Sequence, residues 1–231
     1  MRDEDTSAES TDGGFPTDFG SRVAHEIRGP LNLVAGALSE VGAIDDAKTR
    51  LLQLAERGVA KLGRLADRLS LLSRVETGGL QIGASRSDLY GIADAASERG
   101  RQLVGRRRVE LTICGERSAP VEVDSSLIGM AVQELVENAL RHARAQVQVR
   151  IESSDGQARV EVSDDGRGVS PEDPESLFLR HGVDAPRGGL HIGLSLARAI
   201  ARAHGGDARF EGSIPGERTT FSLVLPTRQS P

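Results

Sequence analysis

The 231-residue chain contains a single cysteine, Cys114. One cysteine excludes an intramolecular disulfide framework and any zinc site built from several cysteines. The chain also lacks an apolar run of the ~18 residues that a bilayer-spanning helix needs. Its N-terminus has no basic and then apolar segment of the signal-peptide kind. These absences predict a cytoplasmic protein without membrane insertion.

Clustered positive charge is absent as well. The formal net charge is −5, and the lysines and arginines are scattered along the chain. A nucleic-acid surface requires a basic patch or stripe, so nucleic acid is not expected as a partner. The first residues are mostly acidic or small and polar, which predicts a disordered acidic tail over residues 1–17.

Two stretches of helical periodicity follow the tail. Apolar residues over 24–41 step by three and four, and residues 51–72 keep the same rhythm with Gly58 as their one weak member. The turn near 42–46 is short, so the two helices are expected to be antiparallel. Each helix of such a hairpin buries only one face, and pairing with a second copy in a four-helix bundle would bury more of the apolar helix surface. A homodimer is therefore expected.

A second domain is expected beyond the glycines at positions 78 and 79, which favour a helix C-terminus. Helical and alternating patterns mix there, and a turn at Asp155-Gly156 predicts a hairpin between two strands. The expected order is helix 88–103, strand 109–114, helix 125–143, strands 147–151 and 158–162, helix 193–204 and strand 219–225.

The first helical stretch carries a candidate nucleophile, His25. It lies one position, or about 100° of rotation, from the apolar Ala24, so it is expected at the edge of the buried face and open to solvent. Glu26 can accept a hydrogen bond from one imidazole nitrogen and leave the other free to attack phosphorus. Pro30 cannot donate to the carbonyl of Glu26, which predicts a bend in the helix there.

Three later motifs contain the residue types of a nucleotide pocket. Asn138 has an amide oxygen suited to Mg²⁺, with His142 four positions further on the same helix face to contact phosphates and Arg141 to neutralise their charge. The second motif is Asp164-Asp165-Gly166-Arg167-Gly168. The third is glycine-rich, over 188–194, and precedes a helix whose unpaired amides favour anions. No Walker-type loop occurs.

Together and in this order, the motifs resemble the catalytic core of two-component sensor histidine kinases over residues 18–226. The resemblance implies an α+β chain of two domains. Residues 18–79 would be a dimerisation and histidine phosphoacceptor domain, a helical hairpin dimerising into a four-helix bundle. Residues 85–226 would be an ATP-binding catalytic domain, an α/β sandwich of the type shared by histidine kinases, type II topoisomerases and heat-shock 90 chaperones.

The resemblance also implies the site. His25 would be the phosphoacceptor with Glu26 beside it, Asn138 would hold Mg²⁺, and the Asp164 carboxylate would accept a hydrogen bond from the adenine amino group. The expected ATP-binding residues are Glu134, Asn138, Arg141, His142, Asp164, Gly166, Gly168, Phe178 from a mobile-lid motif, Gly189, Gly193 and Leu194. ATP and Mg²⁺ are the expected cofactors.

Three positions depart from the family's pattern. His191 replaces the middle glycine of the last motif, Gly29 stands where relatives that dephosphorylate their partner have Thr or Asn, and Glu134 stands where many members have Asn. In the related hydrolytic ATPases a glutamate at this place activates water. A non-kinase ATPase using Glu134 therefore remains an alternative, as does a phosphotransfer or scaffold protein with a decayed ATP site.

The expected function is autophosphorylation of His25 followed by phosphoryl transfer to an aspartate in a response-regulator receiver domain. Only 24 residues precede His25. A sensing part is thus expected to be missing or to lie on another chain, in a separate sensor protein.

Overall fold

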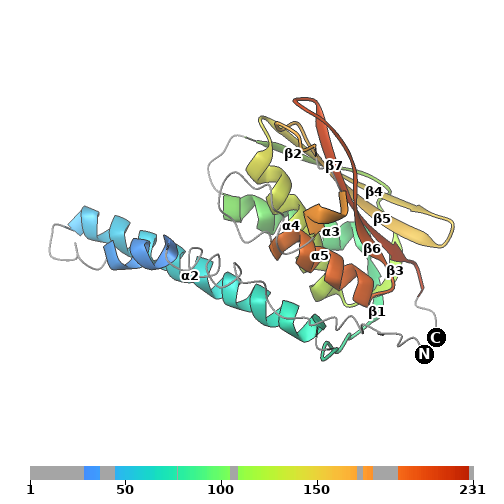
Figure 1. The fold of residues 1–231 in the computed structure, drawn as a ribbon, viewed down its shortest axis with the longest axis horizontal. Helices are drawn as coiled ribbons and strands as arrows, with labels where there is room; N and C mark the ends of the chain where they lie inside the picture. The colour runs from blue at the N-terminus through green and yellow to red at the C-terminus, as the bar shows by residue number, and fades with distance from the viewer. Residues whose placement is uncertain are drawn as a thin grey trace, which may run out of the picture. The chain divides into compact units, whose positions relative to one another are not determined.

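The computed structural model describes residues 29–36, 45–76, 78–104, 109–170, 174–178 and 192–228 (Figure 1). The tail predicted over 1–17 and the two candidate catalytic residues, His25 and Glu26, lie outside this part of the chain. The chain divides into two compact units, one of residues 1–59 and 185–190 and one of residues 60–184 and 191–231. The division falls inside a long helix, and the functional domains at 18–79 and 85–226 stay a prediction.

In the first unit, residues 29–36 form a helix that packs against helix α2, Asp45–Glu76, near Gly58. A Cβ at Gly58 would lie 2.9 Å from Cγ2 of Val34 and 3.0 Å from the carbonyl oxygen of Pro30. The position that looked weakest in the helical pattern is therefore one where the two helices are in close contact. The predicted pair of packed helices is confirmed over the described residues.

The last turns of α2 belong to the second unit. Gly78 has φ 68°, and the amide of Gly79 donates to the carbonyl oxygen of Arg74 across 2.9 Å. This is the glycine-terminated C-cap that the sequence predicts. Leu71 and Leu72, just before it, are buried.

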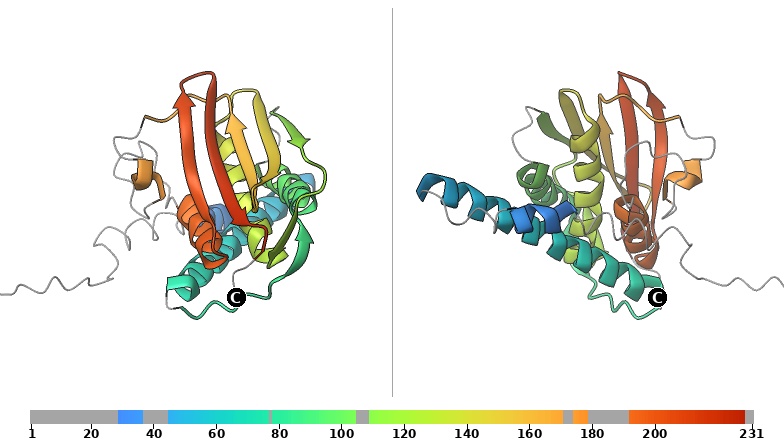
Figure 2. Two further views of the ribbon diagram at one scale, coloured as in Figure 1. Left: turned by 90° about the vertical axis from the view of Figure 1, so that its right-hand side faces the viewer. Right: turned by 60° about the vertical axis from the view of Figure 1, so that its left-hand side comes forward.

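A five-stranded sheet forms the frame of the second unit, with the strand order β2-β4-β5-β7-β6. Strands β2 and β4 are parallel, and the other neighbouring pairs are antiparallel. The strands are β2 (Glu110–Gly115), β4 (Gln146–Ser154), β5 (Gln157–Asp164), β6 (Asp207–Ile214) and β7 (Arg218–Pro226). The helices α3 (Leu89–Val104), α4 (Ser125–His142) and α5 (Ile192–Ala203) cover one face of this sheet (Figure 2).

Strand β5 shows how the core is divided between the two faces of the sheet. Its residues alternate, with Ala158, Val160, Val162 and Asp164 buried and the intervening ones more exposed. The turn before it has φ 52° at Asp155 and 77° at Gly156, the left-handed pair that a tight hairpin requires. The predicted α/β architecture, the hairpin and the three helices are confirmed.

Three strands and a short helix were not expected from the sequence. Strand β1 (Ser85–Asp88) pairs with β3 (Pro120–Val123), β6 forms an edge of the large sheet, and a 3-10 helix η1 spans Pro174–Phe178. Asp88, the residue before α3, caps the helix, because its Oδ2 accepts from the amide of Gly91 across 3.3 Å. Its Oδ1 also accepts from the amide of Ala119 across 2.8 Å, which ties the strand pair to α3.

Among the helices of the described residues, none combines the length and apolar character needed to cross a membrane.

Candidate nucleotide site

The predicted ATP-binding residues within the described part of the chain come from the second unit. They lie on α4, at the end of β5, on η1 and at the start of α5. Gly189 and His191 lie outside the described residues, so their predicted roles are not tested.

Helix α4 supplies the largest group of candidate side chains. Asp124 caps its N-terminus, with Oδ1 accepting from the amides of Ser126 (3.0 Å) and Leu127 (3.1 Å). Residues four apart on a helix lie on one face, so Glu134, Asn138 and His142 form a row along α4. Glu134 is buried, Asn138 is partly exposed, and Arg141 and His142 are exposed.

The end of β5 places Asp164 close to the end of α4. The Asp164 side chain is 5% exposed, and its Oδ1 accepts from the amide of Gly166 across 2.9 Å. A Cβ at Gly166 would lie 2.5 Å from that oxygen and 2.6 Å from the carbonyl oxygen of His142. Only glycine fits there. Gly168 has φ 77°, and a Cβ on it would lie 2.8 Å from Cα of Pro215. Both glycines thus lie where the backbone passes too close to its neighbours, or has too unusual a φ, for another residue.

Burial dominates the electrostatics of Asp164. It raises the pKa of this carboxyl to about 6, the hydrogen bond from Gly166 opposes the rise, and the charge of Asp165 adds to it. An acceptor carboxylate that is shielded from water can form a strong hydrogen bond to an amino group of a ligand. That is the chemistry expected for recognition of an adenine.

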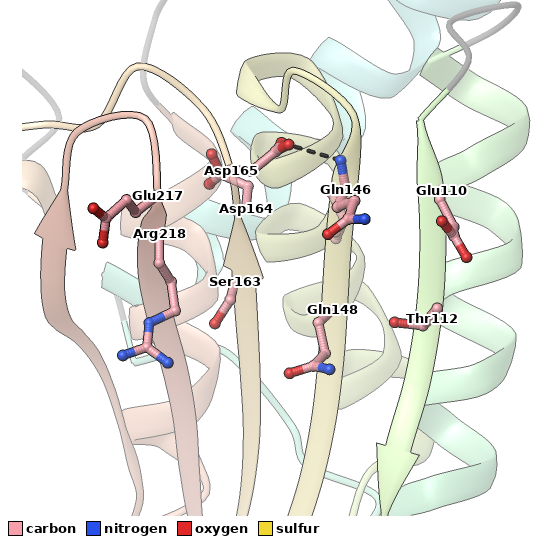
Figure 3. A pocket seen from close by; sticks show the side chains of 10 residues that line it. Glu110, Thr112, Gln146, Gln148, Ser163, Asp164, Asp165, Glu217 and Arg218 are labelled. Carbon is pink, nitrogen blue, oxygen red and sulfur yellow. Dashed lines mark hydrogen bonds between the residues drawn. The ribbon is translucent and has the colours of Figure 1, made fainter.

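The neighbouring Asp165 binds backbone amides, a role that was not predicted from the sequence. Its Oδ1 accepts from the amides of Arg144 (2.9 Å), Ala145 (3.0 Å) and Gln146 (3.0 Å), the last drawn in Figure 3. Burial alone would raise the pKa of Asp165, but these amides outweigh it and lower the pKa. Asp165 thus anchors the end of β5 to the connection between α4 and β4.

The start of α5 meets α4 at Gly193. A Cβ at Gly193 would lie 2.7 Å from Glu134 Oε2, so this glycine lets the first turn of α5 approach the carboxylate. Leu194 is buried beside it. The structure thus brings together Glu134 and Gly193, two of the residues predicted to bind ATP.

An arginine outside the predicted set also reaches Glu134. Arg68 of α2 donates from Nε to Glu134 Oε1 across 2.5 Å and from Nη2 to Glu137 Oε2 across 2.7 Å. Burial raises the pKa of Glu134 to about 7, while the Arg68 charge opposes the rise. The local sequence gives no signal for this pair, since Arg68 reads as one of several charged residues on the outer faces of α2.

Phe178, the candidate from the lid motif, is fixed by α5 and β7. Its ring centre lies 4.8 Å from the Arg198 guanidinium carbon and 6.1 Å from the Phe221 ring centre. Arg198 in turn donates from Nε to Asp207 Oδ1 across 2.8 Å and pairs with Glu175 of η1. Arg198 therefore joins η1, α5 and β6.

A hollow of about 240 Å³ lies on the opposite face of the sheet (Figure 3). Gln146, Gln148 and Ser163 line it, and these belong to the exposed set of their strands. The α4 and α5 candidates lie on the helix-covered face. Asp164 and Asp165, at the end of β5, also line the hollow. The hollow therefore adjoins the candidate nucleotide site at Asp164, although the other described candidate residues are not part of its lining.

The residues present fit a nucleotide with Mg²⁺. Mg²⁺ bound to a nucleotide takes one or two protein oxygen ligands and the rest from phosphate and water, and the Asn138 amide oxygen has the right chemistry for one of them. The first amides of α5 can receive phosphate oxygens. Any side chain at Gly166 would fill the space between the Asp164 carboxylate and the carbonyl oxygen of His142, so glycine keeps this space open.

Comparison with known proteins agrees with this geometry. Residues 123–229 match the family described as histidine kinase-, DNA gyrase B- and HSP90-like ATPase. The sensor protein ChvG of Rhizobium meliloti is 29% identical over 237 residues, covering 93% of this chain. The chain spans 41% of the length of ChvG.

Solved histidine kinases share the fold. The Acinetobacter baumannii histidine kinase AdeS aligns with a TM-score of 0.66 at 22% identity, covering 88% of this chain and 98% of that one. Full-length ShkA in complex with AMPPNP aligns with a TM-score of 0.67 at 20% identity, covering 94% of this chain and 47% of that one. Residues 123–229 belong to the histidine kinase, gyrase B and HSP90 ATPase family, and the chain is a catalytic core of the two-component histidine kinase type.

Proposed function

We propose that this chain uses ATP and Mg²⁺ to phosphorylate its own His25 and then passes the phosphoryl group to an aspartate of a response-regulator receiver domain. The observation that carries the proposal is the meeting of α4 with the end of β5 and the start of α5, through Gly166 and Gly193. The ShkA complex with AMPPNP supports ATP as the nucleotide. The name of ChvG, a sensor protein, supports a signalling role.

The proposed chemistry assigns one task to each residue. Asp164 recognises the base, Asn138 holds Mg²⁺, and the first turn of α5 binds phosphates. One imidazole nitrogen of His25 forms a bond to the γ-phosphorus, and the bond to the β,γ-bridging oxygen breaks with its electron pair leaving on ADP. Glu26 accepts the proton of the other imidazole nitrogen.

A second copy of the chain is the proposed partner of the hairpin. Several large apolar side chains of the first unit are exposed, among them Leu31 (50%), Leu33 (42%), Leu52 (45%) and Val59 (58%). Pairing in a four-helix bundle would cover such side chains. Light scattering coupled to gel filtration tests the dimer directly. The separate sensor protein, the cytoplasmic location and the acidic tail stay predictions.

Labelling with γ-labelled ATP and Mg²⁺ tests the proposed activity. The expected product is a phosphoprotein stable in base and labile in acid, and His25→Gln should abolish it. Asn138→Asp and Asp164→Asn should also remove the label while the protein stays folded and dimeric. Asp155→Asn, at the exposed β4–β5 turn, is the matched control and should label normally.

The same variants separate the alternatives. Sustained phosphate release over many turnovers in His25→Gln would establish a simple ATPase. A folded chain that does not bind ATP would establish a phosphotransfer or scaffold protein. Label that survives in His25→Gln would disprove the assignment of the acceptor.

A further inference from the structure

The ion pair between Arg68 and the two glutamates of α4 has no part in the proposed phosphorylation. Arg68 is 22% exposed, and the side chains of Glu134 and Glu137 are only 6% and 7% exposed. The Nη2 group contacts Glu137, whose other oxygen accepts from Gln133 Nε2 across 2.8 Å. The guanidinium is therefore held at a defined place beside Glu134.

Each oxygen of the Glu134 carboxylate has a defined neighbour. Oε1 accepts from Arg68 Nε, and Oε2 lies against Gly193 at the start of α5. The expected phosphate-binding turn of α5 thus lies directly beside the carboxylate. A free carboxylate at this place is well positioned to take a proton from a water that attacks the γ-phosphorus.

Such a reaction would compete with transfer to His25. The water oxygen forms a bond to the γ-phosphorus, the bond to the β,γ-bridging oxygen breaks with its electron pair leaving on ADP, and Glu134 takes one proton of the water. ADP and inorganic phosphate are the products. A glutamate oxygen that already accepts a hydrogen bond from a guanidinium is a poorer acceptor for that proton.

We propose that Arg68 is a positioning residue that selects the phosphoryl acceptor: by holding the Glu134 carboxylate, it prevents activation of water and reserves the phosphoryl group for His25. This inference rests on the proposed ATP site. Arg68 lies on α2, the same helix that packs against residues 29–36 at Gly58. The group that suppresses hydrolysis thus comes from the hairpin that carries the acceptor.

Phosphate release by the full chain with ATP and Mg²⁺ tests the inference. Arg68→Met keeps most of the apolar stem and removes the donors. It should raise steady-state phosphate release at least about 10-fold, since a general base contributes about 100-fold or more. Arg68→Lys should restore low release, and Arg68→Met combined with Glu134→Gln should return to the unmodified level. ATP affinity should change less than about 3-fold, which separates a loss of control from a loss of the site.

The control is Arg64→Ala, one helical turn earlier, whose side chain makes no ion pair with the described residues. It should leave phosphate release unchanged. If Arg68→Met does not fold, Arg68→Gln serves the same purpose with one hydrogen-bond donor group retained.

Two results would overturn the inference. One is a folded Arg68→Met protein that binds ATP and labels His25 with unchanged phosphate release. The other is elevated release that persists after Glu134→Gln. Failure of the proposed function looks different, because the unmodified chain would then neither bind ATP nor label His25.

Discussion

Oδ1 of Asp164 accepts a hydrogen bond from the amide of Gly166, two residues further along the chain, across 2.9 Å. This short contact folds the backbone back toward the end of α4, where it meets the carbonyl oxygen of His142. Burial makes the carboxylate costly to ionise, so its pKa is raised to about 6. Asp164, the proposed base-recognition residue, is thus held in place by this hydrogen bond, and its burial costs some stability near neutral pH.

The raised pKa of Asp164 predicts a pH dependence of stability. The folded chain binds this proton more tightly than the unfolded chain, so the contribution of Asp164 to stability is lost as the pH rises from about 4 through about 6. Asp164→Asn keeps the acceptor oxygen and does not titrate. Relative to this variant, the unmodified chain should lose on the order of 2 kcal/mol of unfolding free energy between pH 4 and pH 7. Urea unfolding of both proteins measures this, and a constant difference would contradict it.

Gly166→Ala should damage the site where Gly91→Ala does not. The added methyl at Gly166 would meet Asp164 Oδ1 at 2.5 Å and the His142 carbonyl at 2.6 Å, whereas at Gly91 the nearest atom is 3.8 Å away. Gly166→Ala should cost about 2 kcal/mol or more and weaken ATP binding. Gly91→Ala, in α3, should be neutral or stabilise by up to about 1 kcal/mol. Equal unfolding free energies in the two variants would contradict the close packing around Gly166.

Two glycines of α2 predict opposite effects on the hairpin. Gly58→Ala places a methyl 2.9 Å from Val34 Cγ2 and should destabilise by about 1 to 3 kcal/mol. Gly63→Ala, with nothing within 4 Å of its Cβ, should stabilise the helix by up to about 1 kcal/mol. Thermal unfolding followed by circular dichroism compares them. A stabilising Gly58→Ala would mean that the helices do not touch there.

Gly29 predicts weak phosphatase activity toward the phosphorylated regulator. Dephosphorylation requires a water held in line, and glycine has no side chain to hold it. Gly29→Thr or Gly29→Asn should gain activity without unfolding, because Gly29 is exposed with nothing within 4 Å of its Cβ. Loss of label from purified phosphorylated regulator, with ADP present, is the measurement.

Gly36→Thr is the matched control for Gly29, on the same helix and also without atoms within 4 Å of its Cβ. It should gain no phosphatase activity. Rapid, His25-independent loss of label with the unmodified chain would show that another group positions the water.

Local patterns predicted the elements that their own residues specify. Helix α4 has strong apolar periodicity and an N-cap at Asp124, and the β4–β5 hairpin has its turn at Asp155-Gly156, so both were found close to their true limits. Strand β1 has the sequence Ser-Arg-Ser-Asp and owes its conformation to pairing with β3, which no local pattern reveals. Strand β6 is interrupted by an irregularity between Phe210 and Gly212.

The candidate site divides in the same way. Motifs pointed to Asn138, Asp164 and Gly166, because their predicted roles depend on residue type within a short segment. The pairing of Arg68 with Glu134 joins residues 66 positions apart in the sequence. It depends on the packing of α2 against α4, which no local pattern predicts. Gly58 is a weak member of the apolar pattern, which counts side chains. Such a pattern cannot show the close approach of two helices that a missing side chain permits.

The tight turn at Asp155-Gly156 determines whether Asp164 or Ser163 lies on the helix side of β5, at the proposed base-recognition position. It sets the pairing of β4 with β5 so that Asp164 lies opposite Val147 on the helix side, while Ser163 faces outward and bonds Thr220 across 2.8 Å. Sliding the strands by one residue would exchange the two faces and leave a serine beneath α4. Insertions that lengthen the loop are therefore compatible with nucleotide recognition only if they preserve this pairing, whatever their own composition.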